Sequence, residues 1–204
     1  MKNTIAKLII VLAVTILSVS LTFAQTTDEF LITKDSVGRL KLGMTIKQAR
    51  KVLANHHFER TNDKEDFSWA YVKRGDEVLM KLRLMEAGRK KKSSPLQDDA
   101  VIDLIEVFSP IFYTAQGIRP QMLLKNAEMI HKRVVNISEA GDGYTYASFA
   151  EESSRLYYVV ENKALDGEDE VTTNPQTYKL IEYHPTTYIW RISIVMADSR
   201  ACSQ

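Results

Sequence analysis

The sequence predicts an α+β protein made of two tandem β-α-β-β-β units, with antiparallel sheets and the helices packed on one face. Three observations support this. A segment with helical periodicity occurs twice, each copy is followed by segments that alternate apolar and polar residues, and short turns join those segments. Strands joined by short turns run antiparallel, and helices then cover one face of the sheet.

The N-terminal segment Met1–Ala24 has the layout of a secretory signal peptide. Lys2 and Lys7 precede an apolar run, and a small residue, Ala24, stands at the expected cleavage site. Cleavage leaves 180 of the 204 residues and changes the net charge from +1 to −1, because two lysines and no acidic residue are lost. We therefore expect a periplasmic or secreted protein.

The remaining composition narrows the classes of partner. A chain of near-neutral charge lacks the excess of lysine and arginine that nonspecific nucleic-acid binding requires. No later apolar stretch approaches the roughly 20 residues of a transmembrane helix, so we expect no span in the mature chain. The single cysteine, Cys202, excludes an internal disulfide, and Gln25 stands where a lipoprotein would carry its lipid-bearing cysteine.

The internal repeat has an offset of 78 residues and relates Leu40–Val52 to Ile118–Ile130. Met44, Lys47 and Ala49 recur as Met122, Lys125 and Ala127. The repeat divides the chain after the signal peptide into a first helix-plus-sheet unit, 25–109, and a second, 110–204.

Each repeated segment contains a predicted helix. In the first, Thr45 and Gln48 have the spacing of a capping box, and Asn55 is the expected stop. Its apolar positions are Ile46, Ala49, Val52 and Leu53. The second helix follows Pro120, and its apolar positions are Leu123, Leu124, Ala127 and Ile130.

After each helix the hydrophobic period changes to two. In the first unit this predicts strands at 67–72, 78–84 and 101–108. In the second unit the corresponding strands are expected at 144–147, 156–160 and 187–196.

The phrase Asp35–Thr45, ending in Gly43-Met44-Thr45 before a helix, resembles that of small bacterial envelope proteins. Among them are the small lipoprotein of the outer-membrane barrel-assembly machinery and the secreted β-lactamase-inhibitor protein, which is also a tandem repeat of helix-plus-sheet units. The resemblance implies a structural role for the phrase: Gly43 turns the chain from strand into helix. In the second copy Gln121 replaces Gly43, so we expect a turn of different construction there.

Two charged segments interrupt the strand pattern at equivalent places. One is basic and contains Arg89, Lys90, Lys91 and Lys92; the other is acidic and contains Asp166, Glu168, Asp169 and Glu170. They are read as long hairpin loops, which serve either as docking surfaces or as solvated hairpin tips.

Aromatic residues share a face of two predicted strands. Trp69 and Tyr71, together with Phe67, alternate along the first, and Tyr144 and Tyr146 along the second. They form a binding platform if that face is open, or fill the core if a helix covers it. The sequence leaves both alternatives open.

No motif for catalysis, a metal or a cofactor is present. The four histidines lack the close spacing of zinc ligands, the acidic segment lacks the ligand spacing of an EF-hand, and there is no nucleophile elbow or phosphate-binding loop. We therefore expect a non-enzymatic binding or accessory protein of the bacterial cell envelope whose partner is an envelope or secreted protein. The alternatives are an inhibitor of a secreted hydrolase and a hydrolase with an unrecognised site.

Overall fold

The computed structural model describes seven segments of the chain: 28–61, 67–86, 93–131, 134–139, 145–149, 155–161 and 185–196. The predicted signal peptide, the basic and acidic segments, Tyr144 and Cys202 lie outside them. Within the described residues, no helix is long and apolar enough to cross a membrane.

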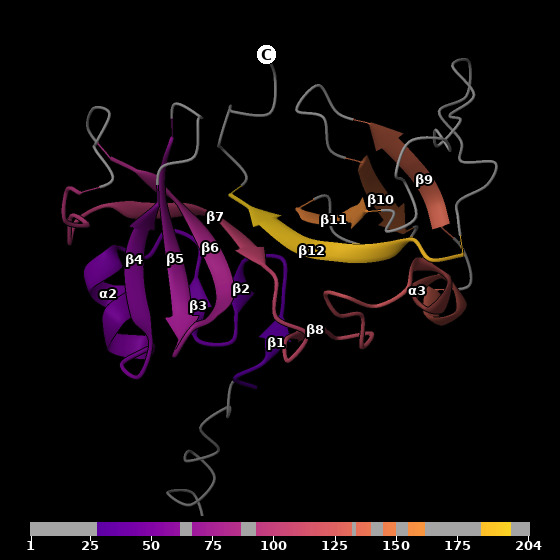
Figure 1. Cartoon of the computed structure of the whole chain (residues 1–204), viewed down its shortest axis with the longest axis horizontal. Coiled ribbons are helices and arrows are strands. Elements are labelled where there is room, and N and C mark those ends of the chain that lie inside the picture. The colour runs from indigo at the N-terminus through magenta and orange to yellow at the C-terminus, as the bar shows by residue number, and fades with distance from the viewer. Residues whose placement is uncertain are drawn as a thin grey trace, which may run out of the picture.

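Two helices and twelve strands are described (Figure 1). In chain order they are β1 (Leu31–Ile32), β2 (Ser36–Val37), β3 (Leu40–Lys41), α2 (Ile46–Val52), β4 (His57–Thr61), β5 (Ser68–Arg74), β6 (Glu77–Met85), β7 (Val101–Val107), β8 (Tyr113–Thr114), α3 (Leu124–His131), β9 (Val134–Glu139), β10 (Thr145–Phe149), β11 (Leu156–Glu161) and β12 (Tyr188–Val195). The predicted α+β class is confirmed.

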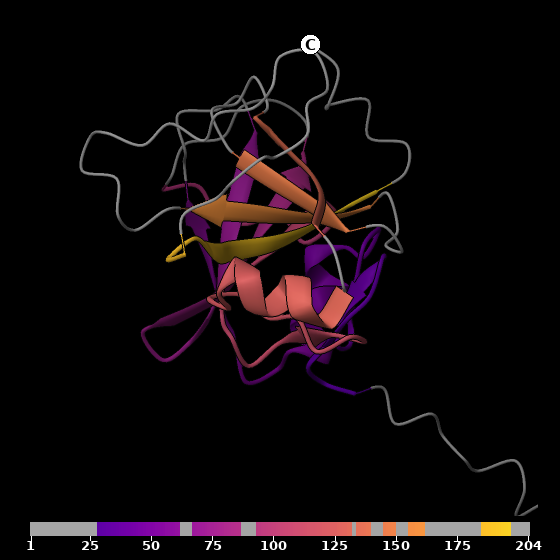
Figure 2. The ribbon, with the colours of Figure 1, turned by 90° about the vertical axis from the view of Figure 1, so that its right-hand side faces the viewer.

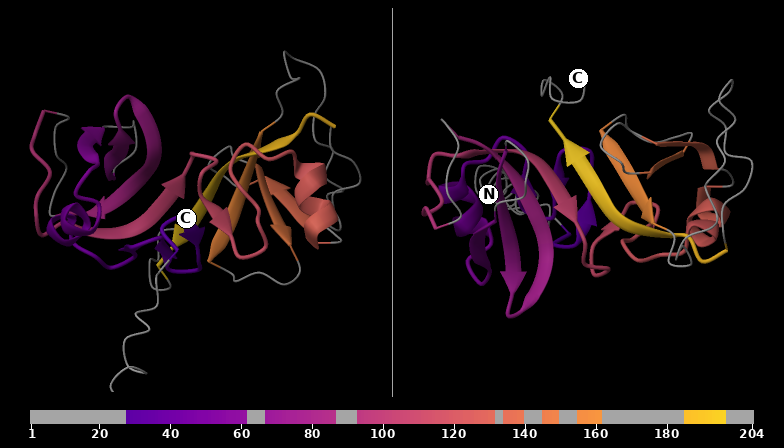
Figure 3. Two further views of the ribbon diagram at one scale, coloured as in Figure 1. Left: turned by 90° about the horizontal axis from the view of Figure 1, so that it is seen from below. Right: turned by 45° about the horizontal axis from the view of Figure 1, so that its top comes forward.

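The larger sheet has eight strands in the order β4-β5-β6-β7-β12-β11-β10-β9, and every neighbouring pair is antiparallel. Its two halves meet where β7 pairs with β12, and these strands run side by side through the middle of the molecule (Figure 3). We call this pairing the seam. Each helix is followed by four strands, whereas the sequence predicted three. The additional strand β4 lacks a clear alternation because Glu59 and Arg60 are adjacent charges within it.

The smaller sheet has the order β3-β2-β1-β8. Its β1 and β8 are parallel, with Leu31 opposite Tyr113, so this pair departs from the predicted antiparallel arrangement. A parallel pair needs a long connection, and here the whole first helix and the first half of the larger sheet lie between the two strands in sequence.

The predicted capping box of α2 is confirmed. The Gln48 N–H donates to Thr45 Oγ1 at 3.3 Å, and the Thr45 N–H donates to Gln48 Oε1 at 2.9 Å. Ile46 and Ala49 are fully buried. The helix ends at Val52, three residues before the expected stop at Asn55, and Leu53 is its C-cap.

The second helix, α3, buries Leu124 and Ala127 as predicted. The prediction that Ile130 belongs to its apolar face is wrong, because Ile130 is 43% exposed. In the last turn of α3 it is His131, not Ile130, that lies against the core: its ring stacks on that of the buried Phe149, with 4.6 Å between the ring centroids.

The chain makes the same turn before both helices, and the prediction of a different turn at Gln121 is wrong. Gly43 has φ +82° and Gln121 has φ +66°, so both adopt the left-handed conformation. The Gly43 N–H donates to the Ile102 carbonyl at 2.8 Å, and the Gln121 N–H donates to the Ile189 carbonyl at 2.6 Å. A hydrogen bond to the strand that closes each half of the larger sheet thus holds both turns.

The following residues repeat this hydrogen-bond pattern. The Ile102 N–H donates to the Met44 carbonyl at 2.9 Å, and the Ile189 N–H donates to the Met122 carbonyl at 2.8 Å. The division of the chain into units 25–109 and 110–204 stays a prediction.

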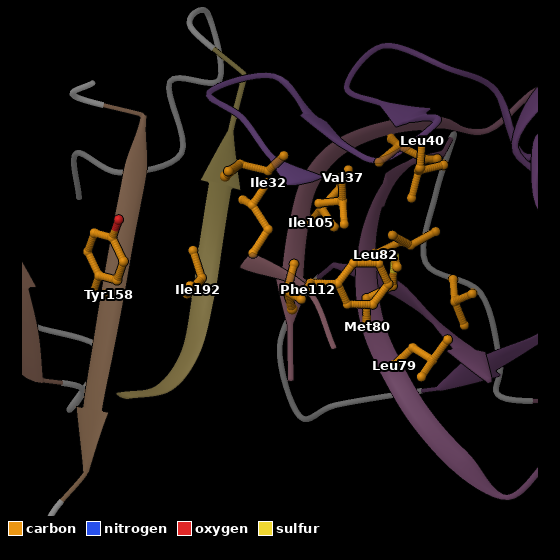
Figure 4. Close-up of a cluster of buried hydrophobic side chains, with 14 of the residues drawn as sticks. Ile32, Val37, Leu40, Leu79, Met80, Leu82, Ile105, Phe112, Tyr158 and Ile192 are labelled. Carbon is orange, nitrogen blue, oxygen red and sulfur yellow. The ribbon is translucent and has the colours of Figure 1, made fainter. Parts of the chain in front are cut away.

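One main core lies between the larger sheet and the elements that cover it. Ile32, Val37 and Leu40 from the smaller sheet point toward Leu82 and Ile105 of the larger sheet (Figure 4). Buried residues of both helices belong to the same cluster, so the helices and the smaller sheet cover one face of the larger sheet. Figure 2 shows α3 on that side of β10, β11 and β12.

Candidate functional site

The face of the larger sheet turned away from both helices carries the candidate site; we call it the far face. Successive residues of a strand point to opposite faces, and Ala70 and Val72 of β5 belong to the main core. Trp69 therefore points to the far face. There it forms a separate buried cluster with Leu104 and Val195, which lie in the same row of cross-strand partners.

A second row on the far face crosses five strands. Tyr71 is opposite Lys81, Lys81 is opposite Glu106, Glu106 is opposite Ser193, and Ser193 is opposite Tyr157. We call these five residues the central row. The row passes over the seam and so places polar residues from both halves of the sheet side by side.

Phe67, Trp69 and Tyr71 form an aromatic stripe, and each of these three rings lies close to a cationic side chain. The Arg83 guanidinium lies 4.9 Å from the Phe67 ring centroid, Lys81 Nζ lies 4.1 Å from that of Trp69, and Lys73 Nζ lies 5.8 Å from that of Tyr71. A cation within about 6 Å of a ring centroid is attracted by the negative face of the ring. The stripe is therefore a mixed cation–aromatic surface rather than a bare aromatic platform.

Arg83 is fixed by a bidentate contact with Asp103. Arg83 Nε lies 3.0 and 3.2 Å from the two carboxylate oxygens, and a terminal guanidinium nitrogen donates to Oδ2 at 2.9 Å. Both side chains are buried. Such a pair holds its geometry firmly because the planar guanidinium matches the carboxylate.

A second buried ion pair joins the two halves across the seam. Arg191 Nε lies 3.1 Å from Glu106 Oε1, and both side chains are more than nine-tenths buried. The Arg191 guanidinium also lies 4.5 Å from the Trp190 ring centroid. Both tryptophans of the chain therefore lie beside a cationic side chain: Trp69 beside Lys81 of β6, and Trp190 beside Arg191 of β12.

The environment of the far face shifts the pKa of Lys81. Burial lowers the pKa of its ammonium group below the usual value; the Glu106 carboxylate opposes this effect, and the Arg191 guanidinium adds to it. Two further polar atoms are buried nearby, Trp69 Nε1 and Ser193 Oγ, and neither has a hydrogen-bond partner in the described part of the chain.

Large apolar side chains are exposed at the margins of the far face. Phe67 is 45% exposed, Met85 is 50% exposed and Tyr157 is 37% exposed. The far face therefore has a charged, largely buried centre with exposed apolar residues around it. Aromatic and methionine side chains of this kind are enriched in protein–protein interfaces.

The structure places only part of the predicted site. Trp69 and Tyr71 lie on β5 and point to the far face, so the helices do not cover them. Tyr146 lies on β10 with its backbone opposite Val159. The predicted Tyr144, the basic residues Arg89–Lys92 and the acidic residues Asp166–Glu170 lie outside the described residues.

Sequence reasoning missed the charged residues beside the aromatic stripe. Lys81 and Arg83 alternate with the buried Leu82 and Leu84 along β6, and this alternation was the signal that two cations share a face. Among the described residues, no three His, Cys, Asp or Glu side chains come together in a way that could hold a metal ion.

Comparison with known proteins shows the fold alone. No protein-family model and no curated protein matches the sequence. The crystal structure of the uncharacterised protein YfeY from Escherichia coli is similar, with a TM-score of 0.52 and 14% sequence identity. The similarity covers 81% of this chain and 99% of the YfeY chain.

Proposed function

We propose that this chain is an exported, non-enzymatic binding or accessory protein of the bacterial cell envelope, and that the far face binds its partner. The observation that carries the proposal is the row of rings and cations on β5 and β6, on the face turned away from both helices. Its exposed apolar margin provides area for burial, and its charged centre provides specificity.

Export and location in the envelope are part of the proposal. They rest on the signal-peptide layout of Met1–Ala24. Fractionation of cells that express the full chain, with mass measurement of the exported product, tests this part. A mature N-terminus at Gln25 in the periplasm or medium supports it, and an intact chain in the cytoplasm overturns it.

Binding by the far face is tested with crosslinking in envelope extracts, followed by affinity capture and mass spectrometry. The informative variant is the double substitution Phe67→Ala with Tyr157→Ala, because both side chains are exposed and their removal should spare the core. The matched control is Met129→Ala with Ile130→Ala, which removes two exposed apolar side chains from α3. Loss of the captured protein with the first variant alone supports the proposal, and equal capture by both variants contradicts it.

The same surface would serve an inhibitor of a secreted hydrolase. Stoichiometric loss of activity in a panel of secreted hydrolases would replace an accessory role by inhibition. Turnover of any substrate in such a panel by the purified chain would overturn its non-enzymatic character.

A further inference from the structure

We propose that Met85 is a reversible oxidation site, and that its sulfoxide weakens the binding of a partner to the far face. The oxidant is a peroxide, and the modified atom is the thioether sulfur of Met85. This inference rests on the proposed function, because it names a way in which the same surface is regulated. It follows from the exposure of Met85, from its place on β6 and from its neighbour Phe67.

Met85 combines exposure with a place on the far face. It is 50% exposed at the end of β6, whereas Met80 of the same strand is 1% exposed and belongs to the main core. Met129 is 73% exposed, but it lies on α3, which covers the opposite face of the larger sheet. The other methionines of the described residues, Met44, Met122 and Met196, are partly buried. Among the described residues, Met85 is therefore the exposed methionine of the far face.

The strand register places Met85 beside a second exposed apolar side chain. Leu84 belongs to the main core, so Met85, the next residue of β6, points to the far face. Ser68 is opposite Leu84 in the antiparallel pair of β5 and β6, and this register brings Phe67 next to Met85. Phe67 is 45% exposed. The two side chains thus form an exposed apolar pair at one end of the far face.

Oxidation of the thioether by a peroxide is a two-electron reaction that needs no other reactant. The sulfur attacks one oxygen of hydrogen peroxide, the O–O bond breaks, an S–O bond forms, and the second oxygen leaves as water after proton transfer. The sulfur is oxidised and the peroxide is reduced. Methionine sulfoxide reductases reverse the change with a thiol reductant. An exported chain lies outside the reducing cytosol, so an exposed thioether there meets such oxidants.

A sulfoxide at Met85 alters the apolar area that the far face offers to a partner. Methionine and aromatic side chains are enriched in protein–protein interfaces, and Met85 and Phe67 are of these types. The sulfoxide oxygen is a strong hydrogen-bond acceptor that water satisfies on the free surface. Burial against an apolar partner removes that water, which costs free energy. Oxidation at Met85 therefore opposes binding, whereas oxidation of Met129 leaves the far face unchanged.

The first part of the test measures the oxidation itself. Purified protein carrying Cys202→Ser, so that no thiol reacts, is treated with hydrogen peroxide, and peptide mass spectrometry follows the sulfoxide at each methionine. We expect Met85 and Met129 to be oxidised roughly tenfold or more faster than Met80, because their sulfur atoms are accessible. Equal rates at Met85 and Met80 overturn the proposal, whether or not a partner is captured.

The second part measures capture from envelope extracts before and after treatment, with the peroxide removed. The variants are Met85→Leu and the matched control Met129→Leu, since leucine has nearly the volume of methionine and no sulfur. Each variant is compared with its own untreated sample. We expect treatment to lower capture roughly threefold or more in the unsubstituted protein and in M129L, and much less in M85L. A methionine sulfoxide reductase should restore the lost capture.

Two outcomes of the second part contradict the proposal. An equal loss of capture in treated M85L and treated M129L shows that Met85 is not the sensitive site. If treatment leaves capture unchanged while the Phe67 and Tyr157 double variant loses the partner, regulation by oxidation is wrong and the proposed function stands.

Discussion

The Arg60 guanidinium and the Glu86 carboxylate form an ion pair of 2.7 Å in which the two side chains are only 3% and 0% exposed. Arg60 also donates to the Ser94 carbonyl at 2.9 Å and to the Pro95 carbonyl at 3.1 Å. It thereby links β4 to residues on both sides of segment 87–92. We expect Arg60→Met to lower the free energy of unfolding by about 3–5 kcal/mol, because it leaves a buried carboxylate without its counter-ion. Urea denaturation followed by circular dichroism measures the change.

The control for this prediction is Arg74→Met. Arg74 pairs with Glu77 at 3.1 Å, but both side chains are about half exposed. We expect that substitution to cost less than about 1 kcal/mol, since exposed ion pairs contribute little. Similar losses for the two variants would contradict a structural role for the buried pair.

The left-handed conformation of Gln121 predicts a stabilising substitution. A residue with a Cβ is strained at φ +66°, whereas glycine adopts this conformation freely. We expect Gln121→Gly to raise the free energy of unfolding by about 0.5–1 kcal/mol, measured by urea denaturation. The reciprocal change Gly43→Gln serves as the control, and it should destabilise by about 1 kcal/mol. A loss of stability in Q121G would show that the Gln121 side chain contributes more than its backbone strain costs.

At Gly38 both the backbone conformation and the space available exclude a side chain more strictly than at Gln121. Its φ is +54°, and a Cβ placed there would lie 2.2 Å from the Glu29 carbonyl oxygen. Because that oxygen belongs to the backbone, a strand end has to move, and we expect Gly38→Ala to cost more than about 2 kcal/mol. Gly75 is the matched control, since its φ is +61° and an added Cβ meets nothing within 4 Å. Equal losses in thermal or urea denaturation of the two variants would rule out the close contact as the cause.

Local patterns predicted most of the elements. The capping box of Thr45 and the alternation along β5 and β6 involve residues that are close in sequence, so their meaning is visible without a fold. The exposure of Ile130 was missed because α3 turns the neighbouring His131 toward the core, where it stacks on Phe149 of β10, and this contact depends on the tertiary structure. The turn at Gln121 was missed because tertiary hydrogen bonding to Ile189 imposes a conformation that the side chain disfavours.

The candidate site was also predictable only in part, because its arrangement depends on tertiary contacts between residues far apart in sequence. The aromatic residues of β5 form a visible stripe, but the face they occupy depends on which side the helices pack. The ion pair between Glu106 and Arg191 joins residues 85 positions apart, and only the pairing of β7 with β12 brings them together. The charged centre of the far face therefore depends on the register between β7 and β12, and no local sequence pattern specifies that register.

Tyr188 predicts a pH-dependent contribution to stability. Its hydroxyl donates to Glu161 Oε2 at 2.5 Å, and burial, followed by this hydrogen bond and the nearby carboxylate, raises the pKa of Tyr188 to about 12. An unfolded tyrosine has a pKa of about 10, so the folded state holds the proton more tightly between these two values. The stabilisation is complete below about pH 10 and is lost as the pH rises toward about 12. We expect Tyr188→Phe to reduce the late-titrating part of the tyrosinate absorbance by the contribution of one tyrosine, and to weaken the fall in stability over this interval. Tyr71→Phe is the control and should keep both features. A titration of Y188F that matches the unsubstituted protein would show that the contact between β11 and β12 does not govern this proton.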